Sequence, residues 1–310
     1  MTKDINRRQF TLGSASLVGA GALGATNASS SESEPQRQDG PFSLRYAPPL
    51  GMFSAHAPDP VEQVHWIADQ GFTAIEDNGM PGRPKQVQEA IRKALDQHDM
   101  QMGVFVAHSE WGGPSFNAKD FGSTDRFKSD MQNAIETAKR VGAKWMTVVP
   151  GKHDQRVHPE FQLAYCVDNL RRAAEMLEPH GLVMVLEPLN WLVNHPGMYL
   201  ERTPQAYAIC RGVNSPSCKI LYDIYHQQIS EGDLIHNIDR AWDEIGYFQI
   251  GDNPGRNEPG TGEINYRKIF EHLKKRGFEG ILGMEHGKAG GSGVESELAV
   301  VRAYREHDPD

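Results

Sequence analysis

The sequence contains little cysteine, with three cysteines in 310 residues at positions 166, 210 and 218. So few thiols at such uneven spacing exclude a disulfide scaffold, and the chain lacks a CxxC motif or Cys/His cluster typical of structural zinc. Cys166 falls in a helical pattern and is most simply a core residue. Cys210 and Cys218 are close enough in sequence to pair across a short loop in an oxidising compartment.

An excess of positive charge is also absent. The chain has 32 Lys and Arg residues against 41 Asp and Glu residues, which gives a formal net charge of −9. A nucleic-acid-binding face normally shows a basic excess, so the sequence predicts no nucleic-acid partner. No apolar run is long enough to cross a bilayer, so we expect no membrane span in the mature protein.

The first 28 residues are interpreted as an export signal. Two adjacent arginines in NRRQFTL precede a mildly apolar run at residues 13–25, and small residues follow it. This pattern resembles a bacterial twin-arginine (Tat) signal, which predicts the Tat export machinery as a partner and a periplasmic location. The alternative is an unstructured tail that contains two arginines by chance. Residues 29–42 are polar and are predicted to form a linker, and residues 43–310 form the predicted enzyme domain.

Apolar, strand-like runs alternate with helical patterns along the rest of the chain. Glycines typical of helix ends precede several of these runs. Eight strand–helix units predict an α/β fold, a parallel (β/α)8 TIM barrel, for which about 250 residues is typical. A final helix near residues 294–306 is expected on the outside. The predicted strands cover residues 44–53, 72–77, 101–107, 144–149, 182–187, 219–224, 246–251 and 280–285.

Four of the predicted strands end in an oxygen-bearing side chain. In a barrel of parallel strands, the C-terminal strand ends converge on one mouth. Three carboxylates would repel one another there unless a cation lay between them. Oxygen ligands without sulfur or imidazole favour Mg²⁺ or Mn²⁺, with Co²⁺ as a substitute. The sequence therefore predicts a divalent-metal site, and hence an enzyme, although any single ligand has a capping or salt-bridging role as its alternative. The predicted ligands are Glu187, Asp223, Gln249 and Glu285.

Long insertions follow the third, fifth and seventh predicted strands, at residues 108–124, 188–202 and 251–265. All three lie on the side of the barrel where this fold keeps its chemistry. They are rich in Trp, Asn, His and Gly, and loops of this length with aromatic side chains are typical of a pocket wall and lid. His108 and Trp111 in the first insertion are predicted to line the substrate pocket, with a structural role as the alternative.

Several motifs surround the predicted ligands: EPLN from Glu187, DIYH from Asp223, QIGD from Gln249, ME ending at Glu285, and the loop PGRNEPGTGEINY at 254–266. Together they resemble the hydroxypyruvate isomerases of the xylose-isomerase-like barrel superfamily, which also contains ketose 3-epimerases. The resemblance covers residues 44–306, and the loop is its most specific part.

This resemblance implies a role for each matching residue. It implies that Glu187 and Glu285 bind the metal and also exchange the proton, while Asp223 and Gln249 complete the coordination. It further implies that His226 and Arg256 hold substrate oxygens; a structural histidine is the alternative for His226. Barrels of this superfamily often form dimers or tetramers, so a homo-oligomer is expected.

The chemistry of the residues agrees with this interpretation. Moving a carbonyl between adjacent carbons requires removal of a carbon-bound proton, and a chelating metal stabilises the enediolate that results. One carboxylate takes the proton and a second returns it. Arg256 offers a planar fork that fits a substrate carboxylate, which favours hydroxypyruvate over a neutral sugar. Its alternative is a loop arginine paired with Glu258 or Glu263.

The predicted function is therefore a divalent-metal-dependent aldose–ketose isomerase, which converts hydroxypyruvate to tartronate semialdehyde. A ketose 3-epimerase, or an isomerase of a free sugar or inosose, is the nearest alternative because it would use the same proton transfer. A phosphodiesterase would need more His and Asp ligands and a basic groove. A non-catalytic exported sugar-binding barrel would be expected to lose one of the two glutamates, and both are present. Glu76, at the end of the second strand, is predicted to be exposed or paired, or to orient a neighbour of the metal site.

Overall fold

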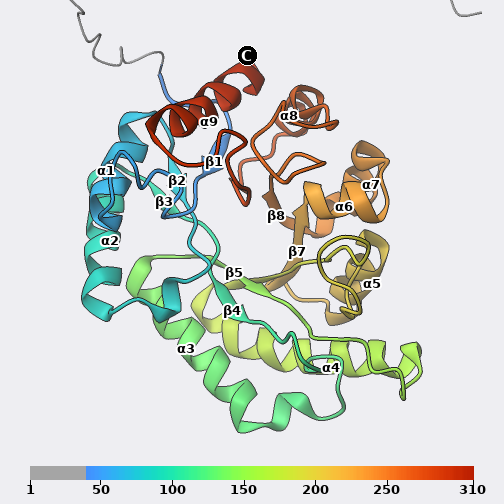
Figure 1. Cartoon of the computed structure of the whole chain (residues 1–310). Helices are drawn as coiled ribbons and strands as arrows, with labels where there is room; N and C mark the ends of the chain where they lie inside the picture. Colours follow the sequence, from blue (N-terminus) through green and yellow to red (C-terminus); the bar gives the residue numbers. More distant parts are fainter. Residues whose placement is uncertain (1–39) are drawn as a thin grey trace, which may run out of the picture. The chain divides into compact units, whose positions relative to one another are not determined.

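The computed structural model describes residues 40–310. Within them, parallel strands form the inner layer and helices cover their outer side (Figure 1). The predicted export signal and most of the predicted linker lie outside the described residues, so these domain boundaries stay predictions. The strands are β1 Arg45–Ala47, β2 Ala74–Ile75, β3 Gln101–Met102, β4 Val106–His108, β5 Trp145–Val148, β6 Val183–Leu186, β7 Cys218–Asp223, β8 Ile245–Gln249 and β9 Ile281–Gly283.

Helices connect these strands, and α9 matches the final helix predicted from the sequence. Within residues 40–310, no helix combines the length and apolar character that a bilayer crossing requires. The helices are α1 Pro60–Asp69, α2 Lys85–Gln97, α3 Asp125–Val141, α4 Pro159–Leu177, α5 Thr203–Val213, α6 Ile224–Ser230, α7 Leu234–Ala241, α8 Tyr266–Lys275 and α9 Val294–His307, with 3-10 turns at Met80–Gly82, Phe121–Ser123, Glu178–His180 and Trp242–Glu244.

Hydrogen bonds between strand ends close the sheet into a barrel. Seven strands pair in the order β1-β9-β8-β7-β6-β5-β4, and β2 pairs with β3. The N–H of Leu50 donates to Glu76 O (3.1 Å), and the N–H of Glu76 donates to Pro48 O (3.1 Å), which joins the β1 side to β2. The N–H of Thr147 donates to Phe105 O (2.8 Å), which joins the chain after β3 to β5. The predicted TIM barrel is therefore confirmed.

The third predicted strand differs from the prediction because it is divided into β3 and β4. The division begins at Gly103, where a Cβ atom would lie 2.4 Å from the Tyr247 hydroxyl. The pairing of β4 with β5 also shifts register between Val106 and His108. The Tyr247 side chain, which comes from β8, thus lies against the backbone at the point where this strand is divided.

Alternation along the strands gives the barrel an apolar interior with a polar end. One buried cluster contains residues from β1, β2, β6, β7, β8 and β9, together with Val104 between β3 and β4, and none from a helix, so it lies inside. Because side chains alternate faces along a strand, the inward positions after Val183 and Val185 lead to Glu187, and the position after Tyr247 leads to Gln249. The cluster consists of Ala47, Ala74, Val104, Val183, Val185, Leu221, Tyr247 and Ile281.

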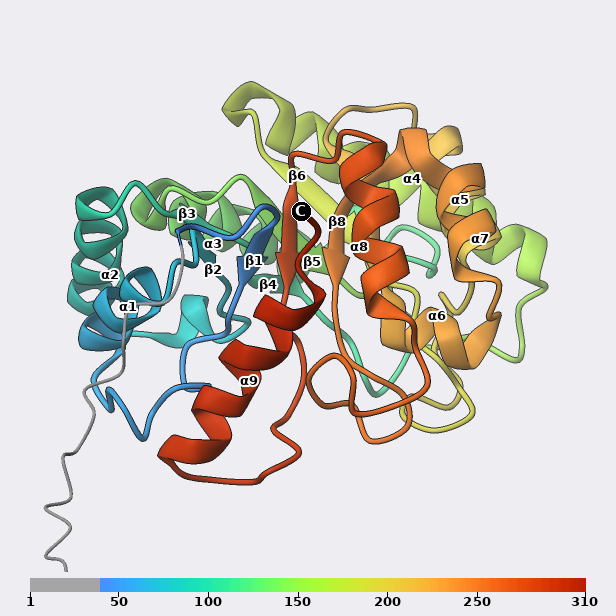
Figure 2. The same cartoon turned by 90° about the horizontal axis from the view of Figure 1, so that it is seen from above.

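The strands share one direction, so their C-terminal ends and the loops that follow lie at one end of the molecule. Figure 2 shows β1 and β8 pointing the same way, with the long loop after β8 beyond their tips. The predicted ligands are therefore brought to the same mouth by the direction of the strands.

The three cysteines are buried and free. Cys166 lies in the core on α4, as predicted. A hydrogen bond with Cys218 and burial raise the pKa of the Cys210 thiol well above its ordinary value. The two thiols of α5 and β7 are thus in contact without the disulfide that the sequence had left open.

Candidate active site

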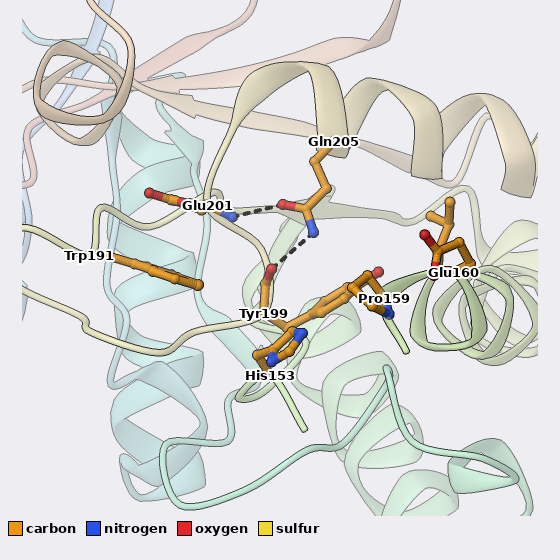
Figure 3. Close-up of a pocket in the computed structure, with 8 residues that line it drawn as sticks. His153, Pro159, Glu160, Trp191, Tyr199, Glu201 and Gln205 are labelled. Atoms are coloured by element: carbon orange, nitrogen blue, oxygen red, sulfur yellow. Dashed lines mark hydrogen bonds between the residues drawn. The ribbon is translucent and has the colours of Figure 1, made fainter. Parts of the chain in front are cut away.

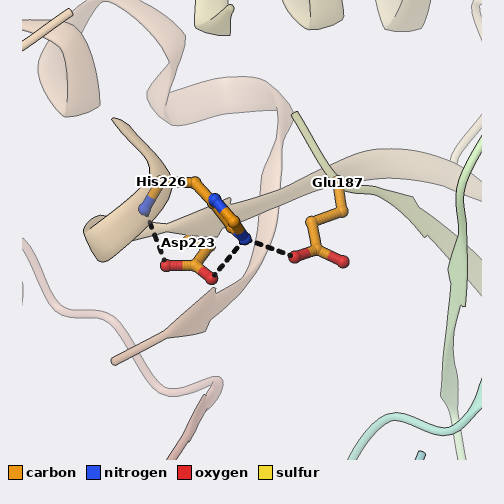
Figure 4. Close-up of side chains that lie close together, drawn as sticks. All are labelled: Glu187, Asp223 and His226. Atoms are coloured by element: carbon orange, nitrogen blue, oxygen red, sulfur yellow. Dashed lines mark hydrogen bonds and ion pairs between the residues drawn. The ribbon is translucent and has the colours of Figure 1, made fainter. Parts of the chain in front are cut away.

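Three predicted site residues form a buried group at the ends of β6 and β7 (Figure 4). His226 Nε2 lies 3.7 Å from Glu187 Oε1 and 3.6 Å from Asp223 Oδ2. One potential ligand atom from each residue lies within 4.8 Å of the others. Buried carboxylates are normally paired or bound to a metal, so this group is a candidate ion site.

The DIYH motif has its spacing because Asp223 caps a helix. Asp223 ends β7 and is the N-cap of α6, where its Oδ1 accepts a hydrogen bond from the His226 N–H (3.1 Å). The cap places His226 in the first helical turn, with its ring beside the carboxylate that caps the helix. The second oxygen, Oδ2, takes no part in this cap.

Arg256 joins Asp223 to the fourth predicted ligand, Glu285. Its Nη2 donates to Asp223 Oδ2 (2.9 Å) and to Glu285 Oε2 (2.7 Å). Asn78 donates to the other Glu285 oxygen at 2.8 Å. The guanidinium therefore pairs with predicted metal ligands. The alternative pairing with Glu258 or Glu263 is not observed.

The formal charges of this group suit a divalent cation. Three carboxylates, Glu187, Asp223 and Glu285, and the single guanidinium of Arg256 leave a formal charge of −2 when all are ionised. Asp223 is 1% exposed and Glu187 is 7% exposed, so water screens this charge poorly.

The loop after β8 holds Arg256 in place around a buried carboxylate. Both oxygens of Asp252 accept hydrogen bonds from backbone N–H groups of residues 253, 260, 262 and 264, at 2.9 to 3.1 Å. The Arg256 N–H donates to Asp252 O (2.8 Å), and the Arg256 backbone has a φ of 51°, in the left-handed region. At Gly262 a Cβ atom would lie 2.3 Å from Asn253 O, so the turn requires glycine there.

Gln249 ends β8 directly beside Asp223, its register partner on β7. It is 1% exposed, and its Oε1 is buried without a hydrogen-bond partner. Leaving a buried polar atom unpaired costs about 1–3 kcal/mol. A carbonyl oxygen in this state, next to carboxylates, fits the ligand set of a hard cation.

Asn190 determines which nitrogen of His226 carries a proton. Its Oδ1 accepts from the N–H groups of Val193 and Asn194 (3.1 Å each), so its Nδ2 faces His226 Nδ1 (2.5 Å). The backbone N–H of Asn190 donates to the same ring nitrogen at 3.3 Å. With two donors on Nδ1, the neutral ring carries its proton on Nε2. His226 thus presents an N–H group at Nε2. An N–H group can donate to a substrate oxygen but has no lone pair for a cation.

Burial dominates the proton affinities in this group. It raises the pKa of Glu187 well above the ordinary value, and repulsion from Glu285 and Asp223 raises it further. Burial also raises the pKa of Glu285, although Arg256 opposes this rise. Burial lowers the pKa of His226 to about 4, so the ring is neutral at physiological pH. Two carboxyls with raised proton affinity suit proton transfer near neutral pH.

The structure places His108 and Trp111 differently from the other predicted residues. His108 is buried, with Nδ1 against Asp130 Oδ2 (2.8 Å) and Nε2 against Ser115 Oγ (3.0 Å). Both ring nitrogens are engaged, so this structure does not favour a substrate-binding role. Trp111 is exposed and stacks on His195 (ring centroids 5.1 Å apart), which lies 5.3 Å from the His226 ring. Trp111 is therefore two rings away from the buried group.

A hollow of about 360 Å³ lies between the loops after β5 and β6 and the first turns of α4 and α5 (Figure 3). Gln205 closes one side, because it donates to Tyr199 O (2.9 Å) and accepts from the Glu201 N–H (3.1 Å). None of the predicted site residues lines this hollow. Its lining residues are His153, Pro159, Glu160, Leu163, Trp191, Tyr199, Glu201 and Gln205.

Sequence reasoning missed two residues of the site and undervalued a third. Asn78, the donor to Glu285, lies two positions after Glu76, and this alternation could have placed it in the mouth. Asn190 lies in the EPLN motif, but its hydrogen bond to His226 joins residues 36 positions apart, which no local pattern shows. His195 lies in an insertion without strand or helix periodicity, so no local signal marks it.

Comparison with known proteins extends these findings. A family model described as Xylose isomerase-like TIM barrel matches residues 64–304. The chain is 38% identical to the hydroxypyruvate isomerase of Escherichia coli (strain K12) over 165 residues, which cover 53% of this chain and 64%, just under two thirds, of that protein. It is 30% identical to the 2-oxo-tetronate isomerase of Cupriavidus necator over 257 residues, which cover 82% of this chain and 92% of that protein.

Solved structures show the same architecture. An AP endonuclease, family 2 from Brucella melitensis aligns with a TM-score of 0.73 and 27% identity, covering 84% of this chain and 99% of that chain. A D-psicose 3-epimerase, crystallised in the presence of D-fructose, aligns with a TM-score of 0.71 and 17% identity, covering 85% and 98%. The second likeness shows the fold alone.

A closed parallel barrel with a buried acidic group at its C-terminal mouth defines this chain as a TIM-barrel enzyme. The chain belongs to the Xylose isomerase-like TIM barrel family. The predicted family and the predicted isomerase class are confirmed at this level, because the matched relatives are isomerases.

Proposed function

We propose that this chain is a divalent-metal-dependent isomerase that interconverts a short 2-keto acid and its aldehyde isomer, with hydroxypyruvate as its substrate. The observation that carries the proposal is the buried group itself. Three carboxylates and the unpartnered Gln249 Oε1 converge with a single guanidinium among them.

The residues present fit a hard cation. Glu187, Asp223, Gln249 and Glu285 would hold it through oxygen atoms, with Mg²⁺ or Mn²⁺ favoured. When bound, the ion would polarise the substrate carbonyl and stabilise the negative charge that develops on deprotonation.

Proton transfer is assigned to the two glutamates. Glu187 takes the proton from the carbon next to the carbonyl, because its burial raises its proton affinity. Glu285 returns a proton to the neighbouring carbon. His226 donates from Nε2 to a substrate oxygen, a role supported by the two donors that Asn190 directs at Nδ1. Arg256 binds the substrate carboxylate through Nη1, because its Nε and Nη2 donate to Glu285 and Asp223.

The acid substrate is supported by the relatives named for hydroxypyruvate and 2-oxo-tetronate and by the position of Arg256. The ketose 3-epimerase alternative is supported by fold likeness alone. An endonuclease function, which the name of the Brucella structure suggests, conflicts with the net charge of −9.

Deuterium wash-in tests the proposal. The purified chain is analysed for bound metal and then incubated in heavy water with hydroxypyruvate, 2-oxo-tetronate and a panel of neutral ketoses. We expect metal-dependent exchange on the acids. Exchange that persists in excess chelator would remove the ion from the mechanism, and exchange on ketoses alone would support the epimerase.

We also propose that the chain is exported through the Tat pathway to the periplasm, on the basis of its first 28 residues alone. Replacement of both arginines, Arg7→Lys with Arg8→Lys, should retain the protein in the cytoplasm when cells are fractionated. Unchanged export of this variant would contradict the proposal.

A further inference from the structure

Glu76 is a buried carboxyl inside the barrel that the proposed proton transfer does not use. It follows β2 and is 1% exposed. Its Oε2 accepts a hydrogen bond from the Tyr247 hydroxyl at 3.0 Å, and its Oε1 is buried without a partner. A carboxyl in such a position is costly to bury, so its presence in the barrel requires a reason.

Two glycines leave the space that this pair occupies. A Cβ atom on Gly283 would lie 1.9 Å from Glu76 Oε2, and one on Gly103 would lie 2.4 Å from the Tyr247 hydroxyl. Neither glycine has a positive φ, so the backbone conformation does not demand glycine at these positions. Space for the Glu76–Tyr247 pair accounts for both.

The pair lies directly against Gln249. Tyr247 precedes Gln249 by two positions on β8 and therefore faces the same side of the sheet. Gly283, against which Glu76 packs, is the register partner of Gln249 on β9. Burial raises the pKa of Glu76 well above its ordinary value, and the neighbouring Gln249 side chain partly opposes this rise. Of the Gln249 side-chain atoms, Oε1 is the one that is buried without a hydrogen-bond partner.

A second residue of the same chain segment also contacts the site. Asn78, two positions after Glu76, donates to Glu285 Oε1 at 2.8 Å. The segment after β2 thus hydrogen-bonds to one proposed ligand, Glu285, and lies beside a second, Gln249, although it supplies no ligand itself.

We propose that Glu76 and Tyr247 form a positioning pair that holds the Gln249 amide with its nitrogen inward and its Oε1 toward the ion, an inference that rests on the proposed function. An amide can present either end to a site, and only the oxygen end binds a cation. Partners that orient a ligand typically contribute about 10–100-fold to metal affinity.

The test is calorimetric titration of Mn²⁺ into the metal-free full chain and its variants. Tyr247→Phe and Glu76→Ala should each weaken Mn²⁺ binding by about tenfold or more. Glu76→Gln keeps an oxygen for both donors, and it should bind Mn²⁺ within about threefold of the wild type. Tyr46→Phe is the matched control, because it also removes a hydroxyl bonded to a carboxylate, Asp308 (3.0 Å), while its ring packs against Phe270 and Tyr304 on the helices and not inside the barrel.

Equal Mn²⁺ affinity in Tyr247→Phe, Glu76→Ala and the wild type would overturn the positioning role while the proposed function stands. An equal loss in Tyr46→Phe would also overturn it, because the effect would then be one of general stability. A wild-type chain that binds no Mn²⁺ would instead contradict the proposed function. If Glu76→Ala does not fold, as circular dichroism would show, Tyr247→Phe and Glu76→Gln decide the question.

Discussion

Replacement of Arg256 by glutamine should lower stability in the metal-free chain and increase the stabilisation that Mn²⁺ provides. In the metal-free chain, Arg256 is the cation bound to Asp223 and Glu285, at 2.9 and 2.7 Å. Asp223 is 1% exposed, so the loss of this partner leaves a buried carboxylate beside two others. The same loss removes the positive charge that an incoming cation must approach.

Breaking a buried ion pair costs about 3–5 kcal/mol, and the partial exposure of Arg256 places this case near the low end, at about 3 kcal/mol. With about 2–4 °C per kcal/mol for a chain of this size, the melting temperature should fall by about 6–12 °C. At a Mn²⁺ concentration of about 100 times the wild-type Kd, binding adds about 2.7 kcal/mol to the wild type, and the variant, with a lower Kd, should gain more at the same concentration.

Differential scanning calorimetry with and without Mn²⁺ measures both quantities. Arg211→Gln is the control, because Arg211 also contacts two carboxylates, Asp243 and Glu244 (3.4 and 3.3 Å), but its side chain is 58% exposed. It should change stability by no more than about 1 kcal/mol. An Arg256→Gln melting temperature equal to that of the control, or an unchanged response to Mn²⁺, would refute the electrostatic reasoning.

Three further predictions concern other residues. Glu285→Gln should abolish deuterium exchange while the circular dichroism spectrum stays native; undiminished exchange would exclude it from proton transfer. Asp252→Ala removes the acceptor of four backbone N–H groups, so proteolysis of residues 251–265 should accelerate and kcat/KM should fall about tenfold or more; an unchanged cleavage rate would contradict this. Burial lowers the pKa of His108, so its contribution to stability is complete above the unfolded pKa of about 6.5 and is lost as pH falls, by at most about 1.4 kcal/mol per pH unit. Urea unfolding of wild type and His108→Gln at pH 7.5 and 5.5 measures this loss, and parallel pH dependence in the two proteins would count against it.

Much of the fold could be predicted because its signals are local. Alternating apolar runs and helix-ending glycines give the order of strands and helices, and the parallel strand direction brings Glu187, Asp223, Gln249 and Glu285 to one mouth. The pairing of Arg256 with Asp223 could not be predicted, because Glu258 and Glu263 are nearer in sequence and carry the same charge. The partners of His108 were equally hidden, since Asp130 lies 22 positions away.

The sequence by itself determined the architecture, the acidic character of the mouth and the set of oxygen donors, because periodicity and strand ends are properties of a few neighbouring residues. Only the tertiary structure decided which donors are satisfied and which remain open. Asn190 fixes the proton of His226, and Glu76 and Tyr247 lie beneath Gln249 because strands distant in sequence are adjacent in the closed barrel. The competition of buried polar groups for partners depends on these distances, and a linear pattern does not contain them.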